Sequence, residues 1–115
     1  MHVGEMIKQI PEHPKYAVSD TGTVYVITSS GLMELKKDIS TGYPRVKLDG
    51  TKVYVSNLVA DVFLELEKKP NYKVFYIDGD KLNCNVRNLI WLSESDIKRY
   101  SQYSVEYRRQ ILGEW

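Results

Sequence analysis

One stretch decides the fold of this chain: VFYIDGDKLNCNVRNLIW, which runs from Val74 to Trp91. Its first residues are β-branched and aromatic, and they predict an extended segment over 73–77 that leads into the turn Asp78-Gly79-Asp80. Two neighbouring aspartates can offer carboxylates to a metal, but Asx hydrogen bonds within a turn are the commoner use of this pattern. We therefore interpret the triplet as a turn.

Composition places limits on the class of protein. The chain has 115 residues, of which 43% are hydrophobic, and it is expected to form one domain or two small motifs that share a core. The single cysteine, Cys84, excludes an internal disulfide and a cysteine-based zinc site. No apolar run of about 18 residues is visible, and residues 1–10 do not resemble a signal peptide. These absences indicate a soluble cytoplasmic protein without a membrane partner. The 16 Lys and Arg face 15 Asp and Glu, and this near balance does not point to nucleic acid.

The chain divides into a strand-rich half and a helical half. Segments of β-branched and aromatic residues bounded by turn residues predict strands over 16–19, 23–27, 32–35, 44–48 and 51–55. The last two are joined by Asp49-Gly50, a strong signal for a two-residue hairpin turn. Ser56 is expected to be the N-cap of a helix that ends before Pro70. A second helix is predicted from the capping box at Ser93 to Leu112, with Gly113 as its stop.

These motifs together resemble the HNH homing endonucleases of phages and mobile introns. The pattern Ile7-Lys8-x-Ile10-Pro11, followed by Tyr16-x-Val18-Ser19-x-x-Gly22, is similar to a small N-terminal motif of these nucleases. Gly42-Tyr43-x-x-Val46, Leu58-Val59-Ala60 and the 74–91 stretch then follow in the family's order and spacing. The resemblance implies an α+β fold, in which small antiparallel N-terminal strands and a hairpin pack on a degenerate ββα HNH-like unit with a C-terminal helix. We expect the N-terminal motif over 1–30 and the HNH-like region over 31–115 to form one compact unit.

The departures from the family pattern lie at the positions that the family uses for catalysis and metal binding. Phe75 stands where the family has a metal-binding Asp, Tyr76 where it has the His that activates water, and Ile97 at a second metal ligand. Ser56-Asn57 replaces a His-Arg pair. Phosphodiester hydrolysis by this fold needs a divalent metal and a general base, and a Tyr with a pKa of about 10 is a poor base. We therefore expect no intact catalytic residue, no metal or other cofactor, and no enzyme activity.

Three further sets of residues are candidates for function. Asn83 and Asn88 match positions at which the family braces its loop. A basic surface around the central hairpin, which the resemblance implies to contact DNA phosphates and which can equally be a solvated strand face, comprises Lys36, Lys37, Arg45, Lys47 and Lys52. A tyrosine stripe at helical spacing with an adjacent arginine is typical of core contact, and also of a protein interface; it comprises Tyr100, Tyr103, Tyr107 and Arg108.

Three functions remain open at this point. The first is a catalytically inactive HNH endonuclease-like phage protein that binds DNA, which the family context favours. The second is a phage protein that reuses the scaffold to bind and inhibit or redirect a host protein, which the near-neutral charge favours. The third is a weakly active metal-dependent DNA nuclease, which the lost catalytic residues disfavour. We take the first as the prediction.

Overall fold

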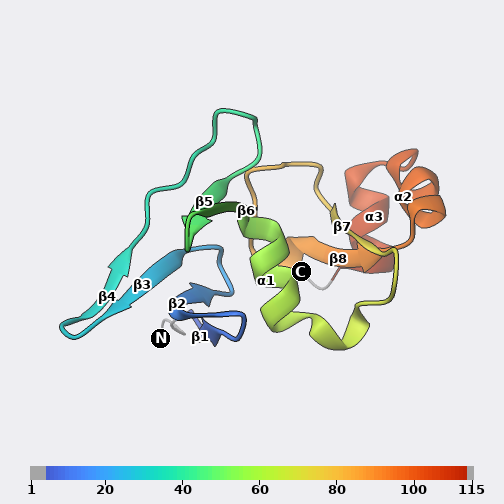
Figure 1. Ribbon diagram of the computed structural model, residues 1–115. Helices are drawn as coiled ribbons and strands as arrows, with labels where there is room; N and C mark the ends of the chain where they lie inside the picture. The colour runs from blue at the N-terminus through green and yellow to red at the C-terminus, as the bar shows by residue number, and fades with distance from the viewer. Residues whose placement is uncertain (1–4, 114–115) are drawn as a thin grey trace, which may run out of the picture.

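The chain folds as an α+β protein in which one helix lies between two groups of antiparallel strands (Figure 1). The computed structural model describes residues 5–113, so the outer ends of the two predicted regions, 1–4 and 114–115, lie outside the described part. The predicted fold class is confirmed: N-terminal antiparallel strands and a hairpin come first, and a two-stranded unit with C-terminal helices follows.

Four antiparallel strands form the N-terminal sheet, in the order β1 (Ile7–Ile10), β2 (His13–Ser19), β3 (Val24–Thr28) and β4 (Gly31–Glu34). The sequence did not predict β1, because apolar and polar residues do not alternate along its four residues, IKQI. In the structure the first three of them are exposed. The sheet runs on to Glu34, past the expected region boundary at residue 30. The β3–β4 hairpin projects away from the rest of the molecule, as Figure 1 shows.

The central hairpin forms as its Asp-Gly pair predicts. β5 (Arg45–Leu48) pairs with β6 (Thr51–Tyr54), and both turn residues have positive φ, 49° at Asp49 and 85° at Gly50. Two successive positive φ angles are the geometry that joins two strands through two residues. Alternate residues of β5 are buried, so its two basic side chains share the outer face of the hairpin.

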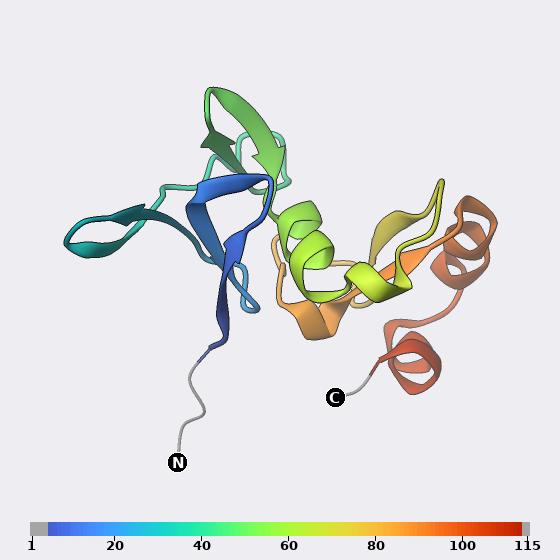
Figure 2. The same cartoon turned by 60° about the horizontal axis from the view of Figure 1, so that its bottom comes forward.

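The helix α1 (Val55–Phe63) follows β6 without a loop and lies at the centre of the molecule (Figure 2). The predicted N-cap at Ser56 is wrong. The cap position is Tyr54, which makes no side-chain cap hydrogen bond, and Ser56 is buried in the first turn. The strand runs directly into the helix because Val55, the first helical residue, is fully buried in the core. A short 3-10 turn, η1 (Glu65–Glu67), follows α1.

The 74–91 stretch forms a two-stranded unit. β7 (Lys73–Tyr76) pairs antiparallel with β8 (Leu89–Leu92), and the loop between them contains the 3-10 turn η2 (Val86–Asn88). Helices follow on the far side of this unit from the N-terminal sheet (Figure 1).

The sequence predicts a single C-terminal helix, but the structure has two, α2 (Glu94–Ser101) and α3 (Val105–Leu112). The break occurs because Ser104 caps a new helix, its Oγ accepting a hydrogen bond from the Tyr107 N–H at 3.2 Å. The predicted cap at Ser93 and the stop at Gly113 are confirmed.

Both predicted regions contribute to one hydrophobic core. Buried residues from the sheet, the hairpin, α1 and the β7–β8 loop meet in it, among them Val18, Leu48, Val59 and Cys84. The approach is tightest at Gly22, where φ is +95° and a Cβ would lie 2.9 Å from the Cβ of Cys84. The Val86 N–H also donates a hydrogen bond to the Asp20 carbonyl at 2.8 Å. The turn between β2 and β3 therefore holds the loop that follows β7. No helix within residues 5–113 is long and apolar enough to cross a membrane.

Candidate functional site

A groove runs along β7, between α1 and the C-terminal helices, and has a volume of about 690 Å³. All four residues of β7 line it, together with side chains of α1, α2, α3 and the end of the β5–β6 hairpin. The three positions at which the sequence departs from the family chemistry, Phe75, Tyr76 and Ile97, all lie in this lining. The structure thus brings them together at one surface.

Phe75 and Ile97 belong to one hydrophobic cluster. Phe75 is 7% exposed and packs with Ile77 and Leu92, and Ile97 of α2 packs against them. The two positions that the resemblance assigns to metal ligands therefore carry no ligand atom and are joined by apolar packing. A carboxylate at either position alone would be placed against an apolar partner, at a desolvation cost that the paired replacement avoids.

Tyr76 faces α1 and is held there. Its hydroxyl donates a hydrogen bond to the Ser56 Oγ at 2.6 Å, and its ring lies 6.1 Å from that of Tyr43. Burial raises the pKa of Tyr76 above its ordinary value, so the hydroxyl is protonated at neutral pH. A protonated hydroxyl that already donates a hydrogen bond is poorly suited to take a proton from water.

The Asp78-Gly79-Asp80 triplet is a turn closed by its own side chains. The Asp78 carboxylate accepts hydrogen bonds from the Asp80 N–H at 2.7 Å and from Asn83 Nδ2 at 2.8 Å. Partial burial would raise the pKa of Asp78, but these hydrogen bonds outweigh burial and hold it below its ordinary value. The hydrogen-bonding capacity of the carboxylate is therefore used within the loop.

Asn88 connects the two ends of this loop and is fully buried. Its Oδ1 accepts a hydrogen bond from the Asp78 N–H at 2.9 Å, and its Nδ2 donates to the Asn83 carbonyl at 3.0 Å. Asn83, the other asparagine that the sequence singles out, is partly exposed and binds Asp78 directly.

The groove does not fit the divalent metal that the resemblance implies for an active nuclease. No group of three His, Cys, Asp or Glu side chains within residues 5–113 is placed to hold a metal ion. Asp61, the one carboxylate in the described lining, is bound by Lys68 Nζ at 2.8 Å. Asp78 lies in the turn, outside the lining, and its carboxylate accepts hydrogen bonds from the Asp80 N–H and Asn83 Nδ2. The oxygen ligands that Mg²⁺ prefers are therefore not gathered here.

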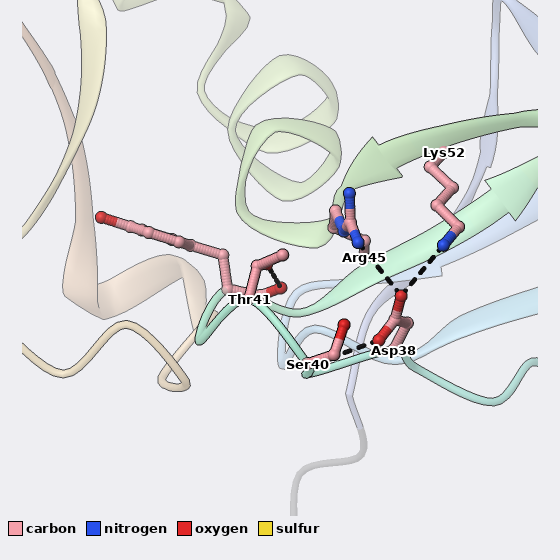
Figure 3. Close-up of polar contacts among 6 residues, drawn as sticks. Asp38, Ser40, Thr41, Arg45 and Lys52 are labelled. Atoms are coloured by element: carbon pink, nitrogen blue, oxygen red, sulfur yellow. Dashed lines mark hydrogen bonds and ion pairs between the residues drawn. The ribbon is translucent and has the colours of Figure 1, made fainter.

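The predicted basic surface lies on the linker before β5 and on the β5–β6 hairpin. Asp38 binds two of its members: one carboxylate oxygen lies 3.1 Å from Arg45 Nη2 and 3.1 Å from Lys52 Nζ (Figure 3). Hydrogen bonds from Ser40, and then from Lys52, hold the pKa of Asp38 well below its ordinary value. Asp38 is therefore ionised at neutral pH and neutralises part of the hairpin.

The other three members of this surface have no such partner. Within residues 5–113, no carboxylate forms an ion pair with Lys36, Lys37 or Lys47. Lys47 is the cross-strand partner of Lys52, and both are exposed. Lys37 lies toward the β7–β8 loop, where its charge opposes the burial that raises the pKa of the Cys84 thiol. The surface as a whole remains positively charged.

The C-terminal tyrosines stack on one another across the α2–α3 junction. Ring centroids are 5.9 Å apart for Tyr100 and Tyr103, and 4.9 Å apart for Tyr103 and Tyr107, both edge to face. Tyr103 and Tyr107 are 38% and 46% exposed, whereas Tyr100 packs on the Phe75 cluster.

Arg108 does not lie beside these tyrosines at the surface, although the sequence groups it with them as a candidate interface. It is 8% exposed, and its guanidinium lies 5.3 Å from the ring centroid of Phe75. The reason is helical geometry: one residue after the exposed Tyr107, the side chain is rotated by about 100° and points toward the β7–β8 unit.

Several groove residues were not predicted from the sequence. Tyr43 and Tyr54 pack edge to face with centroids 5.9 Å apart, and Lys81 Nζ lies 4.9 Å from the Tyr43 centroid. Trp91 also lines the groove, and its buried Nε1 has no hydrogen-bond partner in the described part of the chain. These residues come from separate loops and strands, so no periodic spacing links them. The signals in the sequence are that Tyr43 belongs to the Gly42-Tyr43 motif and that Lys81 and Trp91 lie in the 74–91 stretch.

Comparison with known proteins agrees with this geometry. No protein-family model matches the chain. The H-N-H endonuclease F-TflII of Escherichia phage T5 is 32% identical over 97 residues, which cover 80% of this chain and 50% of that protein. The chain thus spans about half the length of this curated relative.

A comparison with solved structures also finds an HNH endonuclease. A solved structure that describes DNA binding and cleavage by the HNH homing endonuclease I-HmuI superposes with a TM-score of 0.71 and 31% sequence identity. The match covers 92% of this chain and 65% of that one. Sequence and fold together show that this chain belongs to the HNH homing endonuclease family.

Proposed function

We propose that this chain is a catalytically inactive HNH endonuclease-like protein that binds DNA. One observation carries the proposal: the groove keeps a cationic lining, while packed Phe75 and Ile97 and hydrogen-bonded Tyr76 occupy the catalytic positions. The related structure concerns DNA binding and cleavage by I-HmuI. In this chain, DNA binding is retained and cleavage is lost.

The loss of hydrolysis follows from the chemistry of the three side chains. General-base catalysis contributes about 10²–10⁴ in rate, and Tyr76 cannot supply it while its hydroxyl is protonated and bound to Ser56. A divalent metal adds charge stabilisation of the phosphate, and the residues at 75 and 97 offer it no ligand. Both contributions are removed together.

The retention of DNA binding is supported by the basic surface. The outer face of the hairpin presents Lys47 and Lys52 side by side, and exposed Lys36 precedes it on the linker. Phosphate neutralisation by such side chains supplies most of the affinity of nonspecific DNA binding, and it weakens as salt displaces the contacts. Because Asp38 neutralises part of this surface, we expect few phosphate contacts and a modest salt dependence.

The test combines cleavage and binding assays on plasmid and duplex oligonucleotides. With Mg²⁺ or Mn²⁺ we expect no nicking, and without metal we expect DNA binding that weakens with salt. The double variant Lys36→Glu, Lys47→Glu should lose most of this binding. The matched double variant Arg87→Glu, Lys98→Glu, which makes the same charge change at exposed positions elsewhere, should retain it.

Two results would contradict the proposal. Metal-dependent nicking that disappears in Tyr76→Phe would show that the enzyme is active and that the hydroxyl takes part. Equal loss of DNA binding in the two double variants would show that the hairpin is not the contact surface and that only net charge matters.

A second function, the binding of a host protein, is favoured by the exposed pair Tyr103 and Tyr107. Tyrosine is enriched in the energetic centres of protein interfaces. A pull-down from host lysate with and without nuclease treatment separates this function from DNA binding, because a protein partner remains bound after nuclease treatment and a nucleic-acid tether does not.

A further inference from the structure

The charge of Arg108 is not explained by the packing around it. The residue is only 8% exposed, and its buried Nε has no hydrogen-bond partner within residues 5–113. Among residues 5–113, no carboxylate forms an ion pair with it. Its guanidinium instead lies over the ring of Phe75, 5.3 Å from the centroid. Arg45, another arginine with a buried Nε, differs because Asp38 binds its Nη2.

A buried guanidinium without an anion is costly, because charge is taken out of water and a cation–π contact replaces only part of its hydration. A methionine or leucine would cover Phe75 from the same helical position without that cost. The charge is therefore explained by an anion that is present when the protein functions.

The groove supplies the setting for such an anion. Arg108 lines it together with Lys68, Lys73 and Lys81. Lys68 is paired with Asp61 and Lys73 with Glu94, so Arg108 and Lys81 are the lining cations that form no ion pair with a carboxylate of residues 5–113. A site with this excess of positive charge attracts anions, and the planar fork of an arginine matches the two oxygens of a phosphate.

The groove is also continuous with the basic hairpin. Tyr54 lines the groove and is the cross-strand partner of Arg45, on the same outer face of β5–β6. A backbone that crosses the hairpin would pass directly into the groove along β7. This continuity favours a phosphate that belongs to a nucleic-acid strand over a free anion.

We propose that Arg108 binds a backbone phosphate of DNA that lies in the groove, as the fixed cation of a clamp that works without metal. This inference rests on the proposed DNA-binding function and names the residue that anchors the strand in the degenerate site.

The principal variant is Arg108→Met, which keeps the apolar contact with Phe75 and removes the charge. Fluorescence anisotropy with a labelled duplex in EDTA should show at least about tenfold weaker binding than wild type, because one charge-assisted contact is lost. The slope of log Kd against log salt should fall by about 0.9, the value for one phosphate on duplex DNA. Arg87→Met, an exposed arginine outside the groove, should change neither quantity.

A second measurement does not depend on DNA. At constant ionic strength, replacing chloride by inorganic phosphate should raise the melting temperature of wild type more than that of Arg108→Met. Arg108→Lys, which keeps the charge but loses the fork, should be intermediate in both assays, and it serves as the test variant if Arg108→Met fails to fold.

The outcomes separate the two proposals. If Arg108→Met and Arg108→Lys bind DNA with the wild-type affinity and salt slope, the role of Arg108 is overturned and the DNA-binding function stands. If wild type does not bind DNA, the proposed function and the strand in the groove are both overturned. In that case, a phosphate-induced rise in melting temperature that is larger in wild type than in the Arg108 variants would still show an anion site at Arg108. An equal rise in all variants would overturn that site as well.

Discussion

At the scale of single residues, Gly22 determines how closely the N-terminal turn approaches the β7–β8 loop. Its φ is +95°, and a Cβ there would meet the Cβ of Cys84 at 2.9 Å and the Cys84 carbonyl oxygen at 3.2 Å. Glycine is needed twice over, for the backbone angle and for the space. The contact transmits the position of the N-terminal turn to the loop that follows β7.

Gly22→Ala should therefore destabilise the fold by at least about 2 kcal/mol in urea unfolding, the sum of backbone strain and overpacking. Gly42→Ala is the matched control, because Gly42 has a φ of +87° and an added Cβ there would meet no atom within 4 Å. It should cost about 1 kcal/mol, from strain alone. Equal losses in the two variants would show that the contact with Cys84 contributes nothing.

Asn83 makes the stability of the loop depend on pH. Its Nδ2 hydrogen bond helps to hold the pKa of Asp78 below the unfolded value. A lowered folded-state pKa stabilises the fold above the unfolded pKa, and this contribution is lost as the pH falls through the folded pKa. Asn83→Ala should cost about 1 kcal/mol at pH 7, and its difference from wild type should shrink below about pH 4. A pH-independent difference in urea unfolding would mean that the Asp78 bond is not responsible.

At the scale of elements, the α2–α3 junction places three tyrosines in two environments. Tyr103 and Tyr107 stack at the surface, whereas Tyr100 packs on the Phe75 cluster. The cap at Ser104 creates this arrangement, because a continuous helix would not bend the stripe at the junction.

Tyr103→Ala and Tyr107→Ala should each cost about 1 kcal/mol in thermal or urea unfolding, with a coupling of about 0.5–1.5 kcal/mol between them from the edge-to-face pair. Tyr100→Ala is the comparison at a partly buried position that packs on the Phe75 cluster, and it should cost at least about 2 kcal/mol. A loss from Tyr103→Ala as large as that from Tyr100→Ala would place Tyr103 in the core, and the host-protein interface on this face would then be abandoned.

At the scale of the whole molecule, α1 connects strands that lie far apart in the sequence. It contacts β1 and β2 on one side and β7 and β8 on the other. The main core takes residues from the sheet, the hairpin, α1 and the loop. A small chain with one shared core is expected to unfold in a single transition.

Urea unfolding followed by far-UV circular dichroism and by tryptophan fluorescence should therefore give coincident curves. Both tryptophans of the chain, Trp91 in β8 and Trp115, belong to the C-terminal half, so the emission reports that half, while circular dichroism reports all the strands and helices. Gly22→Ala should shift both curves together. Two separate transitions would show that residues 1–30 and 31–115 fold independently.

The local elements could be predicted because their signals are local. Asp49-Gly50 specifies a two-residue turn by its backbone preferences, and the Ser93 and Gly113 signals mark helix boundaries through nearby hydrogen bonds. The family resemblance rests on motifs of the same kind, and it predicted the α+β fold and placed Phe75, Tyr76 and Ile97 in one region.

Tertiary structure alone decided what these side chains do. Ser56 is typical of a cap, but the burial of Val55 starts the helix before it and leaves its hydroxyl to accept a hydrogen bond from Tyr76. Asp38 carries no motif, yet folding places it between Arg45 and Lys52. Arg108 is typical of a surface charge, and only the packing of α3 on β7 buries it over Phe75, with no ion-pair partner within residues 5–113. The sequence by itself determined the family and the side chains at positions 75, 76 and 97, because both reside in residue identities. The groove and its unpaired cation come from contacts between distant segments, which no local pattern records.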